Sequence, residues 1–223
     1  MTIRQARQAD IPEIIKVERR AWPKGGAATS EQFNSRIATF PAGVMVAVID
    51  SRVAGVVAGE IISSNYLEND NISWSGITDD GYIRRSHNPV GDALFGVDLS
   101  VDPEYRNAGV GKALLLEIGK MAIRRNLKMG ILGARMPDYH KYSKDVKPES
   151  YIRLRNRDGR LVDSELRFYE KSGLKLVKVV PHYFPDKDSL DYGVLAVWKN
   201  PFYVRSKSVG MVIGFVGALI FKI

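Results

Sequence analysis

A strand–turn–helix unit near the middle of the chain constrains the fold more than any other feature. The apolar run Leu94–Val101 predicts a strand, and Pro103 ends it because proline cannot donate to a strand ladder. From Gly109 to Asn126, apolar residues recur every three or four positions on one face, which predicts a long amphipathic helix. A strand followed directly by such a helix is typical of a helix-covered sheet in an α/β protein.

The other elements complete a mixed α/β pattern. The hairpin formed by Val44–Ile49 and Val53–Ile62 is nearly apolar on both faces, so it should lie centrally in the sheet. Residues 63–91 are polar and predict a long functional or mobile loop. The further strands and helices are predicted over Thr2–Ala6, Ile11–Trp22, Ser30–Ala38, Met129–Met136, Ser150–Arg157, Asp163–Lys171, Leu174–Val180 and Tyr192–Trp198.

Composition excludes several kinds of site. Among 223 residues there is no cysteine, so disulfides, thiolate metal sites and cysteine nucleophiles are excluded. The three histidines are widely spaced, and no metal site is expected. The first residues lack the apolar core of a signal peptide, and the cytoplasm is the expected location. A net charge of +8 suits nucleic acid, anionic lipid or a phosphorylated cofactor without choosing among them.

The turn between the central strand and helix carries a candidate anion site. Gly109 and Gly111 stand three and five residues after Arg106, where the helix begins. Amide N–H groups at a helix start attract anions, and glycine leaves space for a bulky pyrophosphate. Arg106 and Lys112 add positive charge. The spacing matches neither the dinucleotide fingerprint nor the P-loop.

Two segments resemble motifs of the GNAT superfamily of N-acetyltransferases. The segment Leu99–Leu115 resembles the acyl-CoA motif R/Q-x-x-G-x-G/A, and Phe168–Leu174 resembles the later F-Y-E-K-x-G-F segment. The element order agrees over about residues 2–200. Asn107 departs from the pattern, because glycine is frequent there in the family. The resemblance implies a GNAT-like fold whose central mixed sheet is splayed between its fourth and fifth strands.

A narrower resemblance concerns the GNAT domain that some bacterial proteins carry beside a carbon–nitrogen hydrolase domain. Four runs carry it: Thr78–Tyr82, Gly91–Val97, Ala134–His140 and Tyr183–Ser189. The chain is too short to hold the hydrolase domain as well, and it has no cysteine to serve as that domain's nucleophile. We therefore expect an acyltransferase domain over residues 1–203 and a hydrophobic tail over residues 204–223.

The GNAT resemblance also implies a reaction and a set of residues. An acetyl group would pass from acetyl-CoA to a primary amine by direct attack in a ternary complex. Tyr169 would protonate the leaving thiolate, or its ring would only wedge between helix and sheet. The resemblance implies main-chain contacts to acetyl-CoA on the strand, at Leu99 and Val101. It implies further contacts in the turn, at Arg106, Asn107, Ala108, Gly109, Val110, Gly111 and Lys112.

The sequence is less specific about the residues that would bind the acceptor amine. Asp98 should point away from Leu99, and it would take the amine proton through water or be an ordinary strand-end carboxylate. Arg135 would hold a substrate carboxylate or a loop carbonyl. His140 would act as a base or lie on the surface. Glu18, at the end of the first helix, is predicted to border the acceptor site.

The sequence leaves two other classes of function open. A non-catalytic acyl-CoA-binding regulatory module would keep both glycines without turnover. A nucleic-acid-binding protein is suggested only by the charge, because the chain lacks clustered basic residues with interleaved aromatics. No nucleic-acid partner is therefore expected, and the identity of the amine is not encoded in a recognisable motif.

The tail contains an uncharged apolar run, Ser208–Phe221. Its 14 residues would form a helix of about 21 Å, short of a hydrocarbon core of about 30 Å. Packing on the domain, a protein contact or shallow insertion in a membrane all remain open. Three glycines spaced for close helix approach and flanking basic residues favour a separable membrane or self-association element: Gly210, Gly214, Gly217, Arg205, Lys207 and Lys222.

Overall fold

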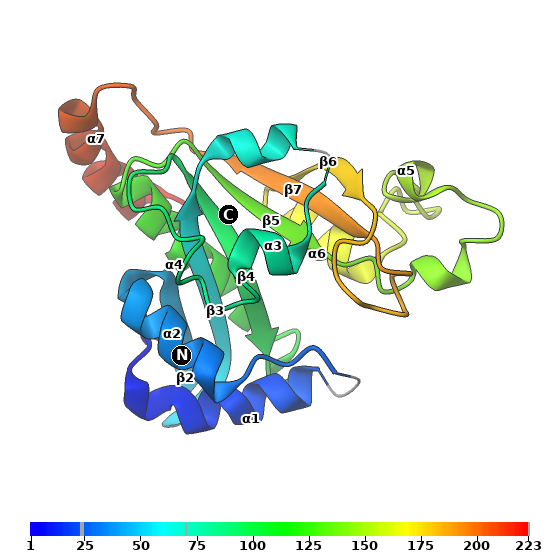
Figure 1. Cartoon of the computed structure of the whole chain (residues 1–223), viewed down its shortest axis with the longest axis horizontal. Coiled ribbons are helices and arrows are strands. Elements are labelled where there is room, and N and C mark those ends of the chain that lie inside the picture. The colour runs from blue at the N-terminus through cyan, green and yellow to red at the C-terminus, as the bar shows by residue number, and fades with distance from the viewer. Residues whose placement is uncertain (23–24, 70, 223) are drawn as a thin grey trace.

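A seven-stranded mixed sheet forms the centre of the molecule (Figure 1). The computed structural model describes residues 1–22, 25–69 and 71–222, without the side chains of residues 207–209 and 211. The strand order is β1-β2-β3-β4-β5-β7-β6, and β4 and β5 are parallel. The strands are β1 Thr2–Gln5, β2 Val44–Ile49, β3 Arg52–Ile62, β4 Ala93–Val101, β5 Met129–Ala134, β6 Lys175–Val180 and β7 Gly193–Lys199. The predicted α/β class is confirmed.

Helices cover this sheet. The long helix α4 packs on the sheet through a buried stripe that includes Leu114 and Ile118, as the sequence periodicity predicts. The α-helices are α1 Ile11–Ala21, α2 Ser30–Thr39, α3 Trp74–Thr78, α4 Val110–Arg124, α5 Pro148–Tyr151, α6 Ser164–Lys171 and α7 Lys207–Ile220. Short 3₁₀ turns lie at η1 Gln8–Asp10, η2 Pro41–Gly43, η3 Ser64–Glu68, η4 Pro103–Tyr105 and η5 Tyr139–Lys141.

The apolar hairpin is central, as predicted. Strands β2 and β3 occupy the second and third places in the sheet, and every residue of β3 after Arg52 is buried. Asp50 and Ser51 join them with positive φ values of 46° and 64°. Two consecutive residues in this region form the turn whose twist matches that of the flanking strands.

The predicted helix over Ser150–Arg157 is wrong. Helix α5 ends at Tyr151, and the chain then turns back on itself, with a bridge between Arg155 and Leu161. The Asn156 side chain accepts hydrogen bonds of 3.0 Å from the amides of Asp158 and Arg160. A local side chain thus replaces the helical backbone partners, which is a common property of asparagine.

The loop over residues 63–91 contains short helices rather than irregular chain alone. Turn η3 and helix α3 lie within it, and α3 is tied to the sheet by the Trp74 indole, whose Nε1 donates to the Val97 carbonyl at 3.0 Å. The loop therefore forms part of the wall above β4.

Strands β4 and β5 diverge after a short paired stretch. Their ladder runs from Ala93 opposite Met129 to Gly96 opposite Leu132, although β4 continues to Val101. A bulge at the neighbouring β3–β4 ladder, between Ala58 and Gly59, changes the course of β4 at the same level. The predicted splay between the fourth and fifth strands is confirmed.

The tail packs along α4. An added Cβ at Gly214 would collide with the Ile123 carbonyl, so the two helix backbones approach closely there. At the end of the tail, the Phe221 ring lies 5.1 Å from that of Trp198. No helix in the described part of the chain is both long enough and apolar enough to cross a bilayer.

Candidate active site

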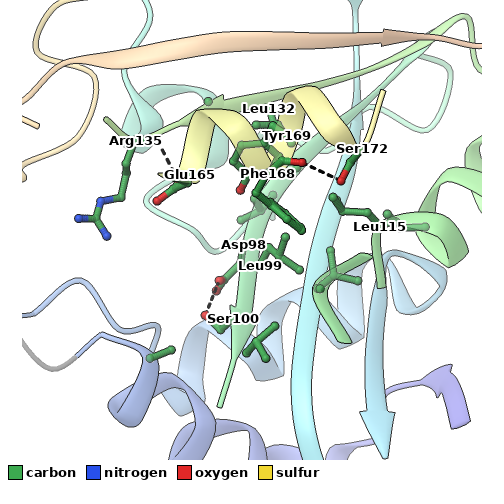
Figure 2. A pocket seen from close by; sticks show the side chains of 18 of the residues that line it. Asp98, Leu99, Ser100, Leu115, Leu132, Arg135, Glu165, Phe168, Tyr169 and Ser172 are labelled. Carbon is green, nitrogen blue, oxygen red and sulfur yellow. Dashed lines mark hydrogen bonds between the residues drawn. The ribbon is translucent and has the colours of Figure 1, made fainter. Parts of the chain in front are cut away.

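A cleft of about 920 Å³ opens where β4 and β5 diverge (Figure 2). Its walls include residues of β4 and α4, which are neighbours in sequence, and of β5 and α6, which follow later in the chain. The parallel pair thus builds a site at the carboxyl ends of its strands, the usual position in α/β sheets.

The glycine turn forms one end of this cleft. Gly109 has a φ of 79° and an added Cβ there would meet no atom within 4 Å. The first helical hydrogen bond runs from the Ala113 amide to the Gly109 carbonyl, at 3.0 Å. The amides of Val110, Gly111 and Lys112 precede that bond, so they are available at the helix end for an anion. Space, donors and charge together fit a pyrophosphate.

The neighbouring residues have different roles in the turn. Asn107 adopts a φ of 64°, the left-handed region in which asparagine is tolerated and glycine is favoured. A Cβ on Gly111 would lie 3.2 Å from Cζ of Phe168, so this glycine lets α6 approach α4. Of the predicted acetyl-CoA residues, Ala108 is the one that does not line the described cleft.

One edge of β4 is unpaired along the cleft. Beyond Gly96, the described residues of β5 provide no ladder partner, whereas β3 continues to pair with the other edge as far as Val101. Leu99 and Val101 both line the cleft. Main-chain groups on this open edge are available to an extended ligand, as the splayed arrangement predicts.

Tyr169 faces the cleft from α6 (Figure 2). Its side chain is 8% exposed, and its hydroxyl makes no hydrogen bond with the described residues. Burial raises the pKa of Tyr169 well above its usual value, and the negative charges of Glu165 and Asp98 raise it further. The phenol therefore keeps its proton at neutral pH, as a general acid must before it reacts.

Glu165 is a cleft residue that the sequence analysis missed. It precedes Tyr169 by one helical turn, and its Oε1 accepts a hydrogen bond from the Arg135 amide at 3.2 Å. Burial raises the pKa of Glu165 to about 7 in spite of the nearby Arg135 guanidinium. The spacing of four residues on a helix was the available signal, because it places both side chains on one face.

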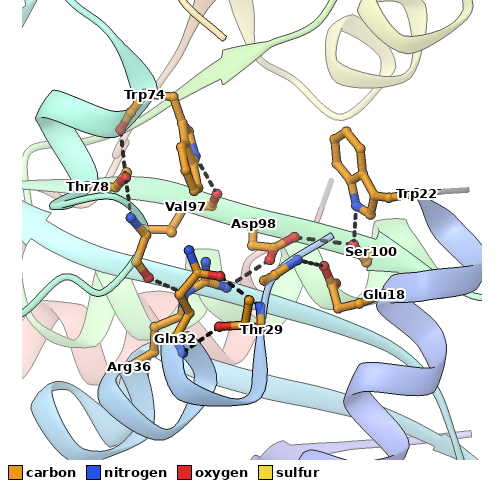
Figure 3. A network of polar contacts seen from close by, with 12 residues as sticks. Glu18, Trp22, Thr29, Gln32, Arg36, Trp74, Thr78, Val97, Asp98 and Ser100 are labelled. Atoms are coloured by element: carbon orange, nitrogen blue, oxygen red, sulfur yellow. Dashed lines mark hydrogen bonds and ion pairs between the residues drawn. The ribbon is translucent and has the colours of Figure 1, made fainter. Parts of the chain in front are cut away.

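Asp98 belongs to a buried network on the opposite wall (Figure 3). Its Oδ2 lies 2.8 Å from Nη1 of Arg36, and its Oδ1 accepts from Ser100 Oγ at 3.2 Å. Ser100 in turn accepts from the Trp22 indole at 2.9 Å. Arg36 also donates to the Gly81 carbonyl at 2.7 Å. The Asp98 charge is therefore balanced, and its side chain is held by residues from several elements.

Glu18 lies behind this wall rather than on it. Its side chain is fully buried and does not line the described cleft. Its Oε2 accepts from the Ala28 amide at 2.9 Å, while Oε1 has no partner among the described residues. Burial raises the pKa of Glu18 to about 8, and the Asp98 carboxylate adds to the effect. Its contact with an acceptor stays a prediction.

The two remaining acceptor candidates are placed differently. Arg135 lines the cleft, with Nε 2.8 Å from Asp186 Oδ2 and its guanidinium 4.9 Å from the Trp22 ring centre. His140 is exposed outside the described cleft wall, with Nδ1 3.1 Å from the Asp188 carbonyl oxygen. Arg135 is thus beside the other site residues, whereas the predicted role of His140 has no support from its position.

The described residues contain no group of three or more histidine, aspartate or glutamate side chains arranged to hold a metal ion.

Comparison with known proteins identifies the family. Residues 11–142 match the Acetyltransferase (GNAT) family. The chain belongs to this family. It is 33% identical to the uncharacterized N-acetyltransferase YkwB of Bacillus subtilis (strain 168), over 92% of each protein. It is also 32% identical to the probable hydrolase YhcX of the same strain, over 93% of this chain but only 40% of that relative.

Solved GNAT structures share the fold. The loading GNATL domain of CurA from Lyngbya majuscula superposes with a TM-score of 0.77 at 22% identity, covering 89% of this chain and 96% of that domain. The GphF GNAT-like decarboxylase in complex with isobutyryl-CoA superposes with a TM-score of 0.76 at 25% identity. The superposition covers 89% of this chain and 99% of that chain. The ribosomal-protein-S18-alanine N-acetyltransferase of Escherichia coli superposes with a TM-score of 0.55 at 14% identity, covering 89% of this chain and 92% of that chain. The protein is an acyl-CoA-dependent GNAT acyltransferase.

Proposed function

We propose that this GNAT enzyme transfers an acetyl group from acetyl-CoA to a primary amine within one ternary complex. The observation that carries the proposal is a single cleft that joins an anion-binding helix start to the Glu165–Tyr169 pair. One end suits the charged part of acetyl-CoA, and the other holds a carboxylate and a phenol suited to proton transfer.

Acetyl-CoA is held mainly by backbone in this proposal. The amides of Val110, Gly111 and Lys112 bind the pyrophosphate, and Arg106 and Lys112 balance its charge. The pantetheine arm follows the open edge of β4 beside Leu99 and Val101. The thioester then lies between that strand and Tyr169.

The chemistry follows from this placement. The neutral amine nitrogen attacks the thioester carbon, a C–N bond forms and the C–S bond breaks. Glu165 accepts the proton that the nitrogen loses, because its pKa of about 7 suits a base near neutral pH. Tyr169 donates its proton to the departing sulfur. Asp98 is retained as the alternative proton acceptor, and Arg135 as a contact for the acceptor molecule.

The carboxylate beside Tyr169 favours an amine acceptor. Glu165 lines the cleft there, and when ionised it attracts an ammonium group on its way to the thioester. Glu18 supports the wall around Asp98 from behind, and His140 enters only if the acceptor extends beyond the cleft.

The test is a turnover screen of the whole chain with acetyl-CoA and a panel of amino acids, polyamines and peptides. We expect thiol release to depend on one amine class and a product heavier by one acetyl group. Binding of acetyl-CoA without turnover of any amine would instead support the regulatory, non-catalytic alternative. Salt-sensitive binding to generic DNA would support the nucleic-acid alternative.

A second candidate function rests on the likeness to GphF, which is named as a decarboxylase. Its TM-score of 0.76 exceeds the TM-scores of 0.53–0.56 for three solved structures named as N-acetyltransferases. A carboxylated acyl-CoA would lose carbon dioxide and take up a proton, with no amine needed. The ionised carboxylate of Glu165 beside Tyr169 disfavours such an anionic acyl group. Carbon dioxide release from malonyl-CoA in the absence of amine would establish this function.

A further inference from the structure

The C-terminal helix α7 presents its two faces in an unusual way. Its small residues face the protein, with Gly210 against Asn126, Gly214 against the Ile123 carbonyl and Gly217 against Phe202. Its large apolar residues face outward. These form what we call the α7 ridge, with exposures between 57% and 70%: Val212, Phe215, Val216, Leu219 and Ile220. Ordinary surface helices bury their large apolar side chains and expose polar ones.

The ridge is continuous. Its members follow one another at intervals of three, one, three and one residues, which places them on a single helical face. Figure 1 shows α7 at the edge of the molecule, beside α4 and far from α5, so no other element in the described chain covers that face. A contiguous exposed apolar patch marks an interaction surface.

Charge around the ridge identifies the kind of partner. From Tyr192 onward the sequence contains four basic residues and no acidic one. Arg124, whose Cα lies 3.4 Å from the position of a Cβ on Gly214, adds a positive charge at the edge of the helix pair. The nearest acidic side chain on the adjoining part of α4, Glu117, is paired with Lys120 at 2.6 Å. The surroundings of the ridge are therefore positively charged.

We propose that α7 docks this enzyme on an anionic lipid bilayer, with the ridge inserted and the helix lying in the plane of the surface. The glycine face cannot meet lipid, because α4, Asn126 and Phe202 cover it. An apolar stripe bordered by basic residues is the pattern that binds acidic headgroups and the acyl boundary together. This inference is independent of the proposed reaction.

A second copy of the chain fits the ridge less well. A two-fold contact places the same patch against itself, so the basic residues around the ridge (Arg124, Arg205 and Lys222) would be brought toward the basic residues of the second copy. Like charges at close range oppose such a contact, whereas phosphate headgroups neutralise them. An anionic bilayer satisfies both the apolar and the charged features.

The test is co-sedimentation of the whole chain with vesicles of phosphatidylglycerol or of phosphatidylcholine. We expect at least about tenfold stronger partition into the anionic vesicles, weakened by added salt. The double variant Phe215→Glu/Leu219→Glu should lose at least about tenfold of this partition. The matched control Val90→Glu/Val177→Glu changes two exposed apolar residues elsewhere and should bind like the unaltered protein. Arg205→Glu/Lys222→Glu should weaken anionic binding while keeping the ridge.

Acetyl-CoA affinity and melting temperature, unchanged in the ridge variant, would show that it is folded, since neither altered residue lines the cleft. The proposal is overturned if the unaltered protein stays in the supernatant with anionic vesicles. It is also overturned if the ridge variant still binds them as well as the control does. A soluble dimer that the ridge variant converts to a monomer, without vesicle binding, would assign the ridge to a second copy.

Discussion

The guanidinium of Arg36 and the carboxylate of Asp98 form a buried ion pair between α2 and β4, with Nη1 2.8 Å from Oδ2 and side-chain exposures of 0% and 7%. The pair joins residues 62 positions apart and fixes the side chain of the candidate Asp98. Both side chains have little access to solvent, so removing one partner would leave the other poorly compensated and would disturb the cleft wall.

Replacing Arg36 by methionine should lower the free energy of unfolding by about 3–5 kcal/mol, because Asp98 is left as a buried unpaired charge. Urea denaturation measures the change. The control is Arg155→Met, which removes an Arg–Glu pair whose side chains are 47% and 39% exposed and should cost less than about 1 kcal/mol. Equal losses in the two variants would show that burial of the Arg36 pair does not matter.

The anion site predicts the effect of a single charge reversal. Lys112→Glu should weaken acetyl-CoA binding by about 10–100-fold, since a charge-assisted contact is replaced by repulsion. Arg19→Glu makes the same charge change at an exposed position of α1 and should leave the affinity unchanged. Calorimetric titration distinguishes them. Lys112 is preferred to Gly111→Asp, which would also strike Phe168. If both charge variants bind acetyl-CoA with the same affinity, the turn is not part of the binding site.

The hydroxyl of Tyr169 is expected to be needed for turnover but not for folding. Tyr169→Phe should lower kcat by about 10²–10⁴-fold, the usual contribution of a general acid. The melting temperature of Tyr169→Phe should stay unchanged, because the hydroxyl has no hydrogen-bond partner among the described residues. The control Tyr192→Phe removes a hydroxyl outside the cleft. If kcat with a true acceptor falls less than about tenfold, the ring is structural.

The pKa of Glu165 predicts how the rate changes with pH on the acidic side of the pH–rate profile. With a pKa of about 7, it is a competent base only when deprotonated, so kcat/KM should rise as pH increases through about 7 and level off above it. In Glu165→Gln this limb should disappear together with most activity. A limb that survives in Glu165→Gln and vanishes in Asp98→Asn would transfer the role to Asp98.

Glu60 predicts how stability depends on pH. Its side chain is fully buried; one oxygen accepts from Ser86 at 2.7 Å and the other has no partner in the described structure. Burial raises its pKa from 4.5 to about 8. The folded state therefore favours the protonated form, whose contribution is complete below pH 4.5 and is lost as pH rises through about 8.

The free energy of unfolding should fall between pH 5 and pH 8, by up to about 1.4 kcal/mol per pH unit from Glu60. Glu60→Gln removes this titration and should flatten the profile, leaving the part that Glu18 contributes. Denaturation at several pH values measures both slopes. Glu149→Gln, at an exposed carboxylate, should retain the original slope. A Glu60→Gln profile as steep as the original would contradict the assignment.

Local features of the chain were predictable because neighbouring residues encode them. The stripe Leu114–Ile118 sets the buried face of α4, and the two turn residues after β2 set the hairpin. The segment around Asn156 was not predictable in this way, because hydrogen bonds to its side chain form a turn where the sequence pattern predicts a helix. The division at residue 203 and the cytoplasmic location stay predictions.

The sequence by itself determined the sheet-and-helix order, the family motifs and the place of the anion site, because strand and helix periods and backbone φ requirements are properties of short segments. The tertiary structure alone decided that Arg36 pairs with Asp98, that Glu165 borders the cleft, and that α7 turns its large side chains outward. Burial, charge balance and pKa depend on which distant segments pack together. No local pattern contains that information, which is why the sequence did not identify Glu165 as a cleft residue and left two alternatives for His140.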